Sequence, residues 1–244
     1  MRLKLLLEAT EDIVIPWSYR SDLTRLVYGL VGLADKDYAS WLYNKGYVRE
    51  RKVYRMFCYS DLECARFEVS SEGFKVRGSM VWQLTSPDEN FIKKLMSGIN
   101  ILSNKLEIFG SKIEVLDAIE TRMPSIDRAI TFHTISPIVV SKQDKGKGSP
   151  PLYLSPQNHS FTESIERNLL FKWEAFNGKP IEQQGFQIRV WDPKSKLVPI
   201  FNIKVRAWHL KLQMWGSDEL VRFAYDTGLG ERNSQGFGMI EVGG

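Results

Sequence analysis

The pattern of apolar and polar residues in the first half of the chain predicts alternating strands and helices. Residues 2–8 alternate as in a strand, and from Leu23 to Leu30 the apolar residues recur every three or four positions, as on one face of a helix. Ser18 or Ser21 is the expected N-cap of this helix. Further elements are expected as strands at 53–59, 65–70, 74–84 and 112–120 and a helix at about 88–103. The resulting order, β-α-β-β-α-β, is that of a ferredoxin-like domain.

The second half repeats this order. Its last helix has the clearest boundaries, because Ser217 is a good N-cap and Gly228 can end the helix. The other elements are expected as strands at 129–140, 185–191, 197–215 and 239–242 and a helix at about 158–176, the strand at 197–215 being long enough to hold a bend or a hairpin partner. We therefore expect an α+β fold of two tandem ferredoxin-like (RRM-like) domains with antiparallel sheets, residues 1–123 and 124–244.

The composition is ordinary for a folded protein, with 43% hydrophobic and 25% charged residues in a chain of 244. No apolar run approaches the roughly 20 residues that a membrane span needs, and charged residues interrupt the N-terminus too early for a signal peptide. We therefore expect a cytoplasmic protein without a membrane partner. The formal charge of +4 permits a polyanionic partner without requiring one. We expect neither a metal site nor a cofactor from the few cysteines and histidines, Cys58, Cys64, His133, His159 and His209.

The most basic and aromatic-rich window of the chain lies between residues 38 and 55. Its basic run consists of Arg49, Arg51, Lys52 and Arg55, with Tyr47 and Tyr54 interleaved. Such a run is typical of a surface that contacts phosphates and stacks on bases, and it is also typical of a solvated strand edge. The lysines Lys142, Lys145 and Lys147 form a second basic segment, which either clamps RNA or is simply exposed to solvent.

A glycine-rich loop follows the last helix. Its four glycines are Gly228, Gly230, Gly236 and Gly238, and Arg232, Asn233 and Ser234 lie between them. Glycine permits a positive φ and a close approach of ligand to backbone amides, although glycines also form plain tight turns. A P-loop or a Rossmann loop is excluded, because the segment follows a helix and no Gly-Lys-Ser/Thr occurs. All seven residues are candidate RNA-binding residues.

The pattern Gly-Leu-Gly-x5-Gly-Phe-Gly, preceded by Ala207-Trp208-His209-Leu210 and a helix, resembles the sixth Cas family, the endoribonucleases that cut CRISPR repeat RNA. Supporting matches are Tyr28 in the first helix, Phe57-Cys58-Tyr59-Ser60 after a basic residue, and Thr134-Ile135-Ser136-Pro137. The resemblance covers essentially the whole chain. It implies a metal-independent ribonuclease in which the 2′-OH attacks the adjacent phosphorus and leaves a 2′,3′-cyclic phosphate and a 5′-OH. CRISPR repeat RNA is the implied partner; other Cas proteins and a second copy of the chain are further candidates.

The resemblance also implies three catalytic positions. Tyr28 matches the family's helical tyrosine, Tyr43 follows Leu42 where many members have a histidine, and Arg55 takes the place of a lysine. A tyrosine of ordinary pKa, about 10, is ionised in only about one molecule in a thousand at pH 7, and arginine stays protonated. Cleavage would therefore depend on positioning and charge. The alternatives are a repeat-RNA-binding protein that does not cut, a general RNA-binding module, and, for both tyrosines, ordinary half-buried aromatics.

Overall fold

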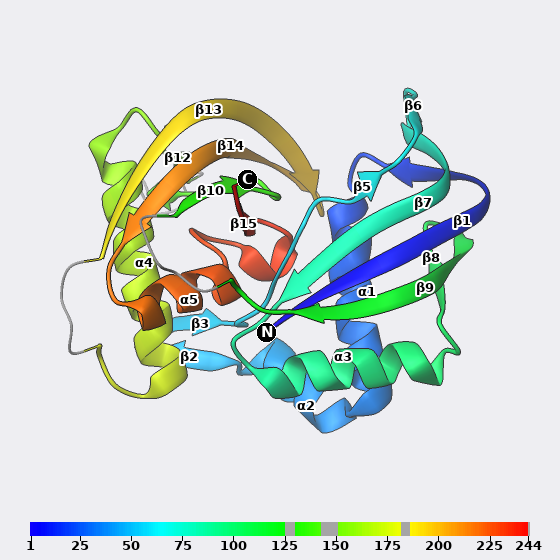
Figure 1. Ribbon diagram of the computed structural model, residues 1–244, viewed down its shortest axis with the longest axis horizontal. Helices are drawn as coiled ribbons and strands as arrows, with labels where there is room; N and C mark the ends of the chain where they lie inside the picture. Colours follow the sequence, from blue (N-terminus) through cyan, green and yellow to red (C-terminus); the bar gives the residue numbers. More distant parts are fainter. Residues whose placement is uncertain (125–129, 143–150, 182–185, 244) are drawn as a thin grey trace.

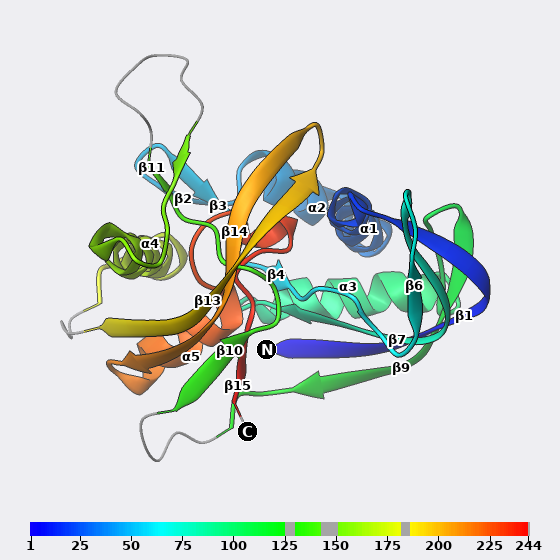
Figure 2. The ribbon, with the colours of Figure 1, turned by 90° about the horizontal axis from the view of Figure 1, so that it is seen from above.

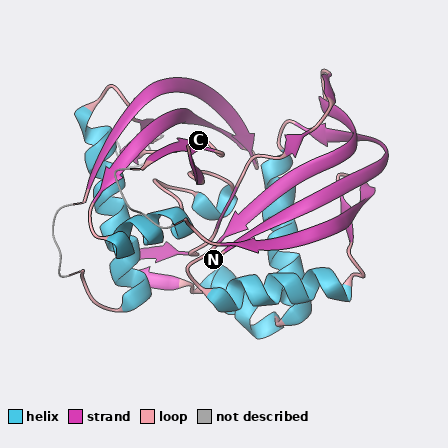
Figure 3. Ribbon diagram, in the orientation of Figure 1, coloured by secondary structure: helices cyan, strands magenta, loops and turns pink. Residues whose placement is uncertain are grey.

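The computed structural model describes residues 1–124, 130–142, 151–181 and 186–243, which form two α+β halves side by side (Figures 1 and 3). The first half contains β1 (Arg2–Pro16), α1 (Tyr19–Ala34), α2 (Lys36–Asn44), β2 (Tyr47–Arg49), β3 (Lys52–Tyr54), β4 (Cys58–Tyr59), β5 (Glu63–Cys64), β6 (Phe67–Val69), β7 (Gly73–Thr85), α3 (Glu89–Ile101), β8 (Lys105–Ile108) and β9 (Ser111–Thr121). The second contains β10 (Thr131–Thr134), β11 (Ser141–Lys142), β12 (Leu152–Tyr153), α4 (His159–Asn177), β13 (Gln187–Ile200), β14 (Ile203–Trp215), α5 (Asp218–Thr227), the 3-10 turn η1 (Asn233–Gln235) and β15 (Ile240–Val242).

The two main sheets have the same topology. In the first, β4, β7, β1, β9 and β8 lie side by side, and in the second the order is β13, β14, β10 and β15. In both sheets the first strand of the motif therefore lies between the third and the fourth, and the second strand pairs with the third. All of these pairs are antiparallel. This is the ferredoxin-like arrangement, and it confirms the predicted fold class.

The core of the first half is formed by one face of β1 and one face of α1, each of which the sequence pattern marks as apolar. Leu3, Leu5 and Leu7 are buried on one side of β1, as the alternation of residues 2–8 predicts. Val27 and Leu30 on α1 are buried in the same cluster. The helices α1 and α3 pack against each other and cover this side of the sheet (Figure 1). Burial of one strand face and one helix stripe thus fixes the position of α1, on which Tyr28 lies.

The structure differs from the sequence prediction in four places. Residues 36–44 form α2, which the sequence analysis did not include; the Asp35 side chain caps it by accepting from the amide of Tyr38. The expected strand 53–59 is instead the end of a hairpin, β2–β3, followed by the short β4. The strands expected at 185–191 and 197–215 are one long, curved hairpin, β13–β14 (Figure 2). The register of this hairpin shifts between Trp191 and Lys194. The expected strand 129–140 also ends early, at Thr134, before Pro137.

The two halves are joined by contacts that cross between them. The β2–β3 hairpin packs against α4, and the buried guanidinium of Arg2 pairs with the carboxylate of Glu241 near the end of the chain. The N-terminal amine of Met1 pairs with Asp226. The expected boundary at residues 123–124 lies between the two main sheets and stays a prediction. None of the described helices is long and apolar enough to cross a membrane.

Candidate functional site

A cavity of about 760 Å³ lies between the two halves, where α1, α2 and β3 face α4 and the glycine-rich loop. All three predicted catalytic residues line it. The lining includes Tyr28, Tyr43, Lys52, Tyr54, Arg55, Asn168, Lys172, Gly230, Glu231, Arg232, Asn233 and Ser234. The fold therefore brings α1, α2 and β3 together with α4 and the glycine-rich loop, which lie more than 100 residues further along the chain.

Tyr28 and Tyr43 are in direct contact in this cavity. Their rings meet edge to face, with centroids 5.3 Å apart, and Tyr28 also meets Phe57 edge to face. Tyr43 is 62% exposed, whereas Tyr28 is half-buried. Burial raises the pKa of Tyr28 against the opposing effects of Arg55 and Ser234. The Tyr28 hydroxyl therefore stays protonated at neutral pH and can donate a hydrogen bond or a proton.

Arg55 supplies a permanent positive charge beside the two tyrosines. Its Nη2 donates to the backbone carbonyl of Tyr43, which ties the end of β3 to the end of α2. A guanidinium cannot readily give up a proton, so its contribution is charge and hydrogen bonding rather than proton transfer. Among the described residues that line the cavity there is no histidine.

The glycines of the loop have a packing role. The amides of Gly228, Gly236 and Gly238 all donate to backbone carbonyls within the protein, so these three amides are not free for a ligand. A Cβ on Gly238 would lie 1.9 Å from the carbonyl oxygen of Leu229, and one on Gly236 would lie 2.3 Å from the ring of Tyr59. Because both glycines also have positive φ, the loop can pack this closely only without side chains there.

The side chains between the glycines of the loop have different roles. Asn233 Nδ2 donates to the carbonyls of Leu229 and Phe237, so this side chain holds the loop together. Arg232 Nη1 donates to the Gln235 side chain at 3.1 Å, with no carboxylate in ion-pair contact within the described part of the chain. Of the predicted RNA-binding residues of the loop, Arg232 is thus available to a ligand in the cavity, whereas the Ser234 side chain interacts with the Tyr28 hydroxyl.

The predicted basic run divides into two kinds of residue. Arg49 pairs with Glu174 on α4, and its guanidinium lies 3.7 Å from the ring centroid of Phe171. It fastens the β2–β3 hairpin to the second half of the molecule. Arg51 and Lys52 are exposed, and Lys52 lines the cavity. Lys142 is also exposed, whereas Lys145 and Lys147 lie outside the described residues.

Sequence reasoning missed the wall that α4 contributes. Lys172 is only 4% exposed, and its Nζ donates to the carbonyls of Gly228 at 2.9 Å and Gly230 at 3.0 Å. Burial lowers the pKa of Lys172 to about 7. A signal was present in the sequence, because Lys172 continues the apolar stripe of Ile165 and Leu169, where a lysine needs a special reason to be buried.

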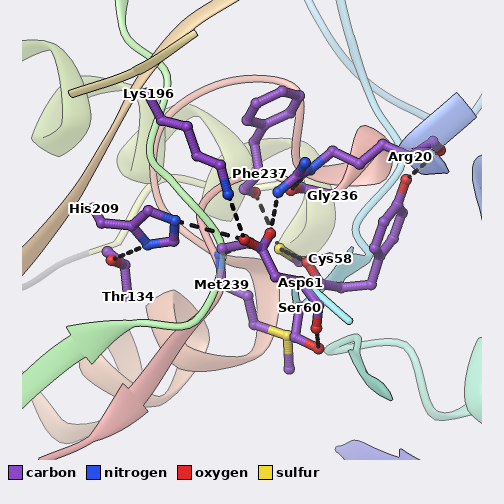
Figure 4. A network of polar contacts seen from close by, with 12 residues as sticks. Arg20, Cys58, Ser60, Asp61, Thr134, Lys196, His209, Gly236, Phe237 and Met239 are labelled. Carbon is purple, nitrogen blue, oxygen red and sulfur yellow. Dashed lines mark hydrogen bonds and ion pairs between the residues drawn. The ribbon is translucent and has the colours of Figure 1, made fainter. Parts of the chain in front are cut away.

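A second polar network lies outside the cavity (Figure 4). Asp61 pairs with Arg20, with Lys196 at 3.3 Å and with His209 at 3.6 Å. The other ring nitrogen of His209 meets the hydroxyl of Thr134. Burial opposes ionisation of Asp61, but Arg20 and the hydrogen bond from His209 prevail and hold the pKa of the carboxyl well below its usual range. His209 thus belongs to this network rather than to the cavity. No group of three or more potential metal ligands occurs in the described ranges.

The chain is similar to known proteins over nearly its whole length. The family model of the CRISPR associated protein Cas6, C-terminal, matches residues 120–242. The CRISPR-associated endoribonuclease Cas6 1 of Methanocaldococcus jannaschii is 28% identical over 247 residues, which cover 98% of this chain and 92% of the relative. The CRISPR-associated endoribonuclease Cas6 of Pyrococcus furiosus is 26% identical over 237 residues, 94% and 84% of the two chains. A solved structure of a CRISPR associated protein Cas6 has a TM-score of 0.82 and 28% identity, covering 100% of this chain and 99% of that one.

Proposed function

The chain belongs to the CRISPR-associated Cas6 family, and from this premise we propose that it is an endoribonuclease that binds CRISPR repeat RNA and cuts it into mature guide RNAs. The observation that carries the proposal is the cavity in which Tyr28, Tyr43 and Arg55 meet the glycine-rich loop. These residues come from α1, from α2 and from the segment after β3. If Tyr28 and Tyr43 were ordinary half-buried aromatics, nothing would require them to share one cavity with Arg55.

The proposed reaction is metal-independent. The 2′-OH next to the scissile bond attacks phosphorus, the 5′-oxygen leaves, and the products carry a 2′,3′-cyclic phosphate and a 5′-OH. Arg55 would stabilise the extra negative charge on the phosphorane, and the protonated Tyr28 hydroxyl would donate to the leaving oxygen or to the phosphate. Tyr43 would help to hold the RNA in line for attack. The proposed reaction proceeds without the histidine base that the resemblance implies for many members of the family.

Binding would depend on the cations in and near the cavity. Arg51 and Lys52 are exposed, and the half-buried Arg232 lines the cavity without a carboxylate partner in the described part of the chain. Contacts of these cations with phosphates would make affinity fall with rising salt concentration. The glycines Gly228, Gly230, Gly236 and Gly238 would act indirectly, by giving the loop its shape. Other Cas proteins and a second copy of the chain stay predicted partners.

The test is a single-turnover cleavage assay with end-labelled repeat RNA transcribed from the CRISPR array of the host genome. We expect one cut that persists in EDTA and leaves a cyclic phosphate. The control substrate carries a single 2′-deoxy nucleotide immediately 5′ of the cut, which removes the nucleophile and should abolish cleavage without weakening binding.

Three other outcomes would contradict the proposal. Tight, repeat-specific binding without a cut would identify the chain as an RNA-binding protein of the same fold. Binding with equal affinity to unrelated RNAs of the same length would favour a general RNA-binding module. Loss of the cut in EDTA would overturn the metal-independent reaction.

A further inference from the structure

One wall of the cavity has a set of polar groups that the proposed reaction does not use. Asn168 and Lys172 are four residues apart on α4, so their side chains lie on the same face of the helix. Both line the cavity, together with Tyr54 at the end of β3. The three residues thus form a polar wall next to Tyr28 and Arg55, which line the same cavity.

Two atoms of this wall are buried without a hydrogen-bond partner. These are the side-chain oxygen of Asn168, Oδ1, and the hydroxyl of Tyr54, for neither of which the described part of the chain supplies a partner. Buried polar side-chain atoms are nearly always paired, because an unpaired one loses its hydration without compensation. Both atoms belong to residues that line the same cavity, so a ligand bound there is in position to supply their missing hydrogen-bond partners.

Lys172 adds a donor to the same wall. With a pKa of about 7, Lys172 is partly protonated at neutral pH. Its ammonium form has three N–H groups, and two of them point to the carbonyls of Gly228 and Gly230. Within the described ranges no carboxylate lies within ion-pair distance of Lys172. The nearby carboxylate of Glu231 instead accepts from the amide and hydroxyl of Ser141. The third N–H of Lys172 is therefore available to an acceptor.

The chemistry of the wall selects among the parts of an RNA. Asn168 Oδ1 is an acceptor, so it needs a donor from the ligand, and a phosphate offers only acceptors at neutral pH. A nucleobase offers donors and acceptors side by side on its edge. The carboxamide of Asn168 can accept from an exocyclic amino group and donate to the neighbouring ring nitrogen, as in bidentate recognition of adenine.

We propose that Asn168, Tyr54 and Lys172 form a subsite that binds the Watson–Crick edge of one unstacked nucleobase from a nucleotide next to the scissile phosphate. The base is adenine or cytosine, in which the amino group lies beside a ring nitrogen that accepts, whereas in guanine that ring nitrogen carries a hydrogen. The proposal rests on the proposed function, which supplies RNA as the ligand. Single-stranded bases splayed out of a stack are the usual targets of sequence-specific RNA recognition. The subsite would let this protein select where in the repeat it acts.

The experiment measures the dissociation constant rather than cleavage. A set of repeat RNAs carries a single abasic site at each position in turn, and every RNA is titrated against the wild type and Asn168→Ala. We expect one abasic position to weaken wild-type binding about tenfold, the discrimination of one good bidentate contact. In Asn168→Ala the intact repeat should bind about tenfold more weakly, and the same abasic site should have no further effect. At that position, purine for adenine or 2-pyrimidinone for cytosine should reproduce the loss.

The controls separate recognition from folding. Asn177→Ala changes an exposed asparagine of the same helix, whose Nδ2 donates to the carbonyl of Trp173, and should leave the abasic profile unchanged. Tyr54→Phe should reduce discrimination at the same position as Asn168→Ala. Because Asn168 Oδ1 is unpaired in the protein, Asn168→Ala should not lower the melting temperature.

Each outcome decides between the subsite and the proposed function. If Asn168→Ala weakens all RNAs equally, or if the responsive base is guanine or uracil, the subsite as proposed is wrong while cleavage can stand. If the coupling is present but no cut occurs, the subsite stands and the endoribonuclease proposal fails. If a 2′-deoxy nucleotide rather than an abasic site weakens RNA binding, the wall contacts a ribose and the base subsite is wrong. Absence of RNA binding by the wild type would overturn the subsite as well.

Discussion

At the scale of single residues, the hydroxyl of Tyr28 gives the most direct test of the proposed reaction. Tyr28→Phe removes one oxygen and keeps the ring contacts with Tyr43 and Phe57. If the hydroxyl donates a proton or a hydrogen bond in the transition state, the single-turnover cleavage rate should fall by about 10²-fold, with little change in the dissociation constant. Since burial raises the pKa of Tyr28 above its ordinary value, the wild-type rate should show no step from its ionisation between about pH 6 and 9. An unchanged rate in the variant would remove Tyr28 from the chemistry.

Tyr43 tests whether a base is the missing component. Its side chain is 62% exposed, so Tyr43→His should leave the core intact. An imidazole with an ordinary pKa of about 6.5 would supply a base near neutral pH, and the cleavage rate should rise by about 10²-fold as pH increases through that value. Tyr43→Asn is the matched control, because it also removes the ring but adds no titrating group. Equal rates for wild type and Tyr43→His at full RNA occupancy would contradict the assignment.

Some residue roles could be predicted from the sequence and others depend on distant partners. The resemblance to the Cas6 family implies Tyr28, Tyr43 and Arg55 as catalytic positions, and the fold places all three in one cavity; their catalytic roles stay predictions. Arg49 looked like Arg51 in the sequence, but its partner Glu174 is 125 residues away. A basic run cannot reveal which member is paired until the fold brings the acid to it.

At the scale of elements, the glycine-rich loop is the segment whose shape is most restricted. Gly238→Ala adds a Cβ 1.9 Å from a backbone oxygen at a φ of +84°, so both strain and overlap oppose it. We expect a loss of about 3 kcal/mol in the free energy of unfolding. Gly178→Ala is the matched control: its φ is +72°, but the added Cβ meets nothing within 4 Å, and it should cost about 1 kcal/mol. Urea denaturation of both variants measures the difference, and equal losses would show that the close packing is unimportant.

The periodicity of apolar residues predicts the long helices of this fold but not its short ones. The helices with long apolar stripes and a capping side chain, α3, α4 and α5, were predicted within a few residues, and Ser217 caps α5 by accepting from the amide of Leu220. The short α2 was missed because its nine residues bury only Leu42, so no stripe is visible in the sequence. The sequence predicts an interruption between the strands at 185–191 and 197–215. In the structure this interruption is a bulge within β13, since pairing with β14 continues on both sides of it.

At the scale of the whole molecule, the halves are connected by charge as well as by apolar contacts. Asp61 follows β4 in the first half, and its partners Lys196 and His209 lie on β13 and β14 in the second (Figure 4). Arg20 on α1 completes the network and also donates to the carbonyl of Gly236, which links it to the glycine-rich loop. A tandem repeat of one topology could be inferred from the order of elements. This connection could not, because its four members are scattered over 190 positions of the sequence.

The final prediction concerns how pH changes this connection. Because the pKa of Asp61 is lower in the folded protein than in the unfolded chain, the carboxylate stabilises the fold fully above its unfolded pKa of about 3.9 and progressively less as pH falls below it. Asp61→Asn leaves three cationic or proton-binding partners facing one another, and should cost about 3 kcal/mol of unfolding free energy at pH 7. The difference from wild type should shrink below about pH 4. Asp192→Asn is the control, since Asp192 forms an exposed pair with Lys211 and should change stability by less than about 1 kcal/mol. Urea denaturation at pH 7, 5 and 3 tests this, and a difference between wild type and Asp61→Asn that stays constant down to pH 3 would mean that the ionised Asp61 does not hold the halves together.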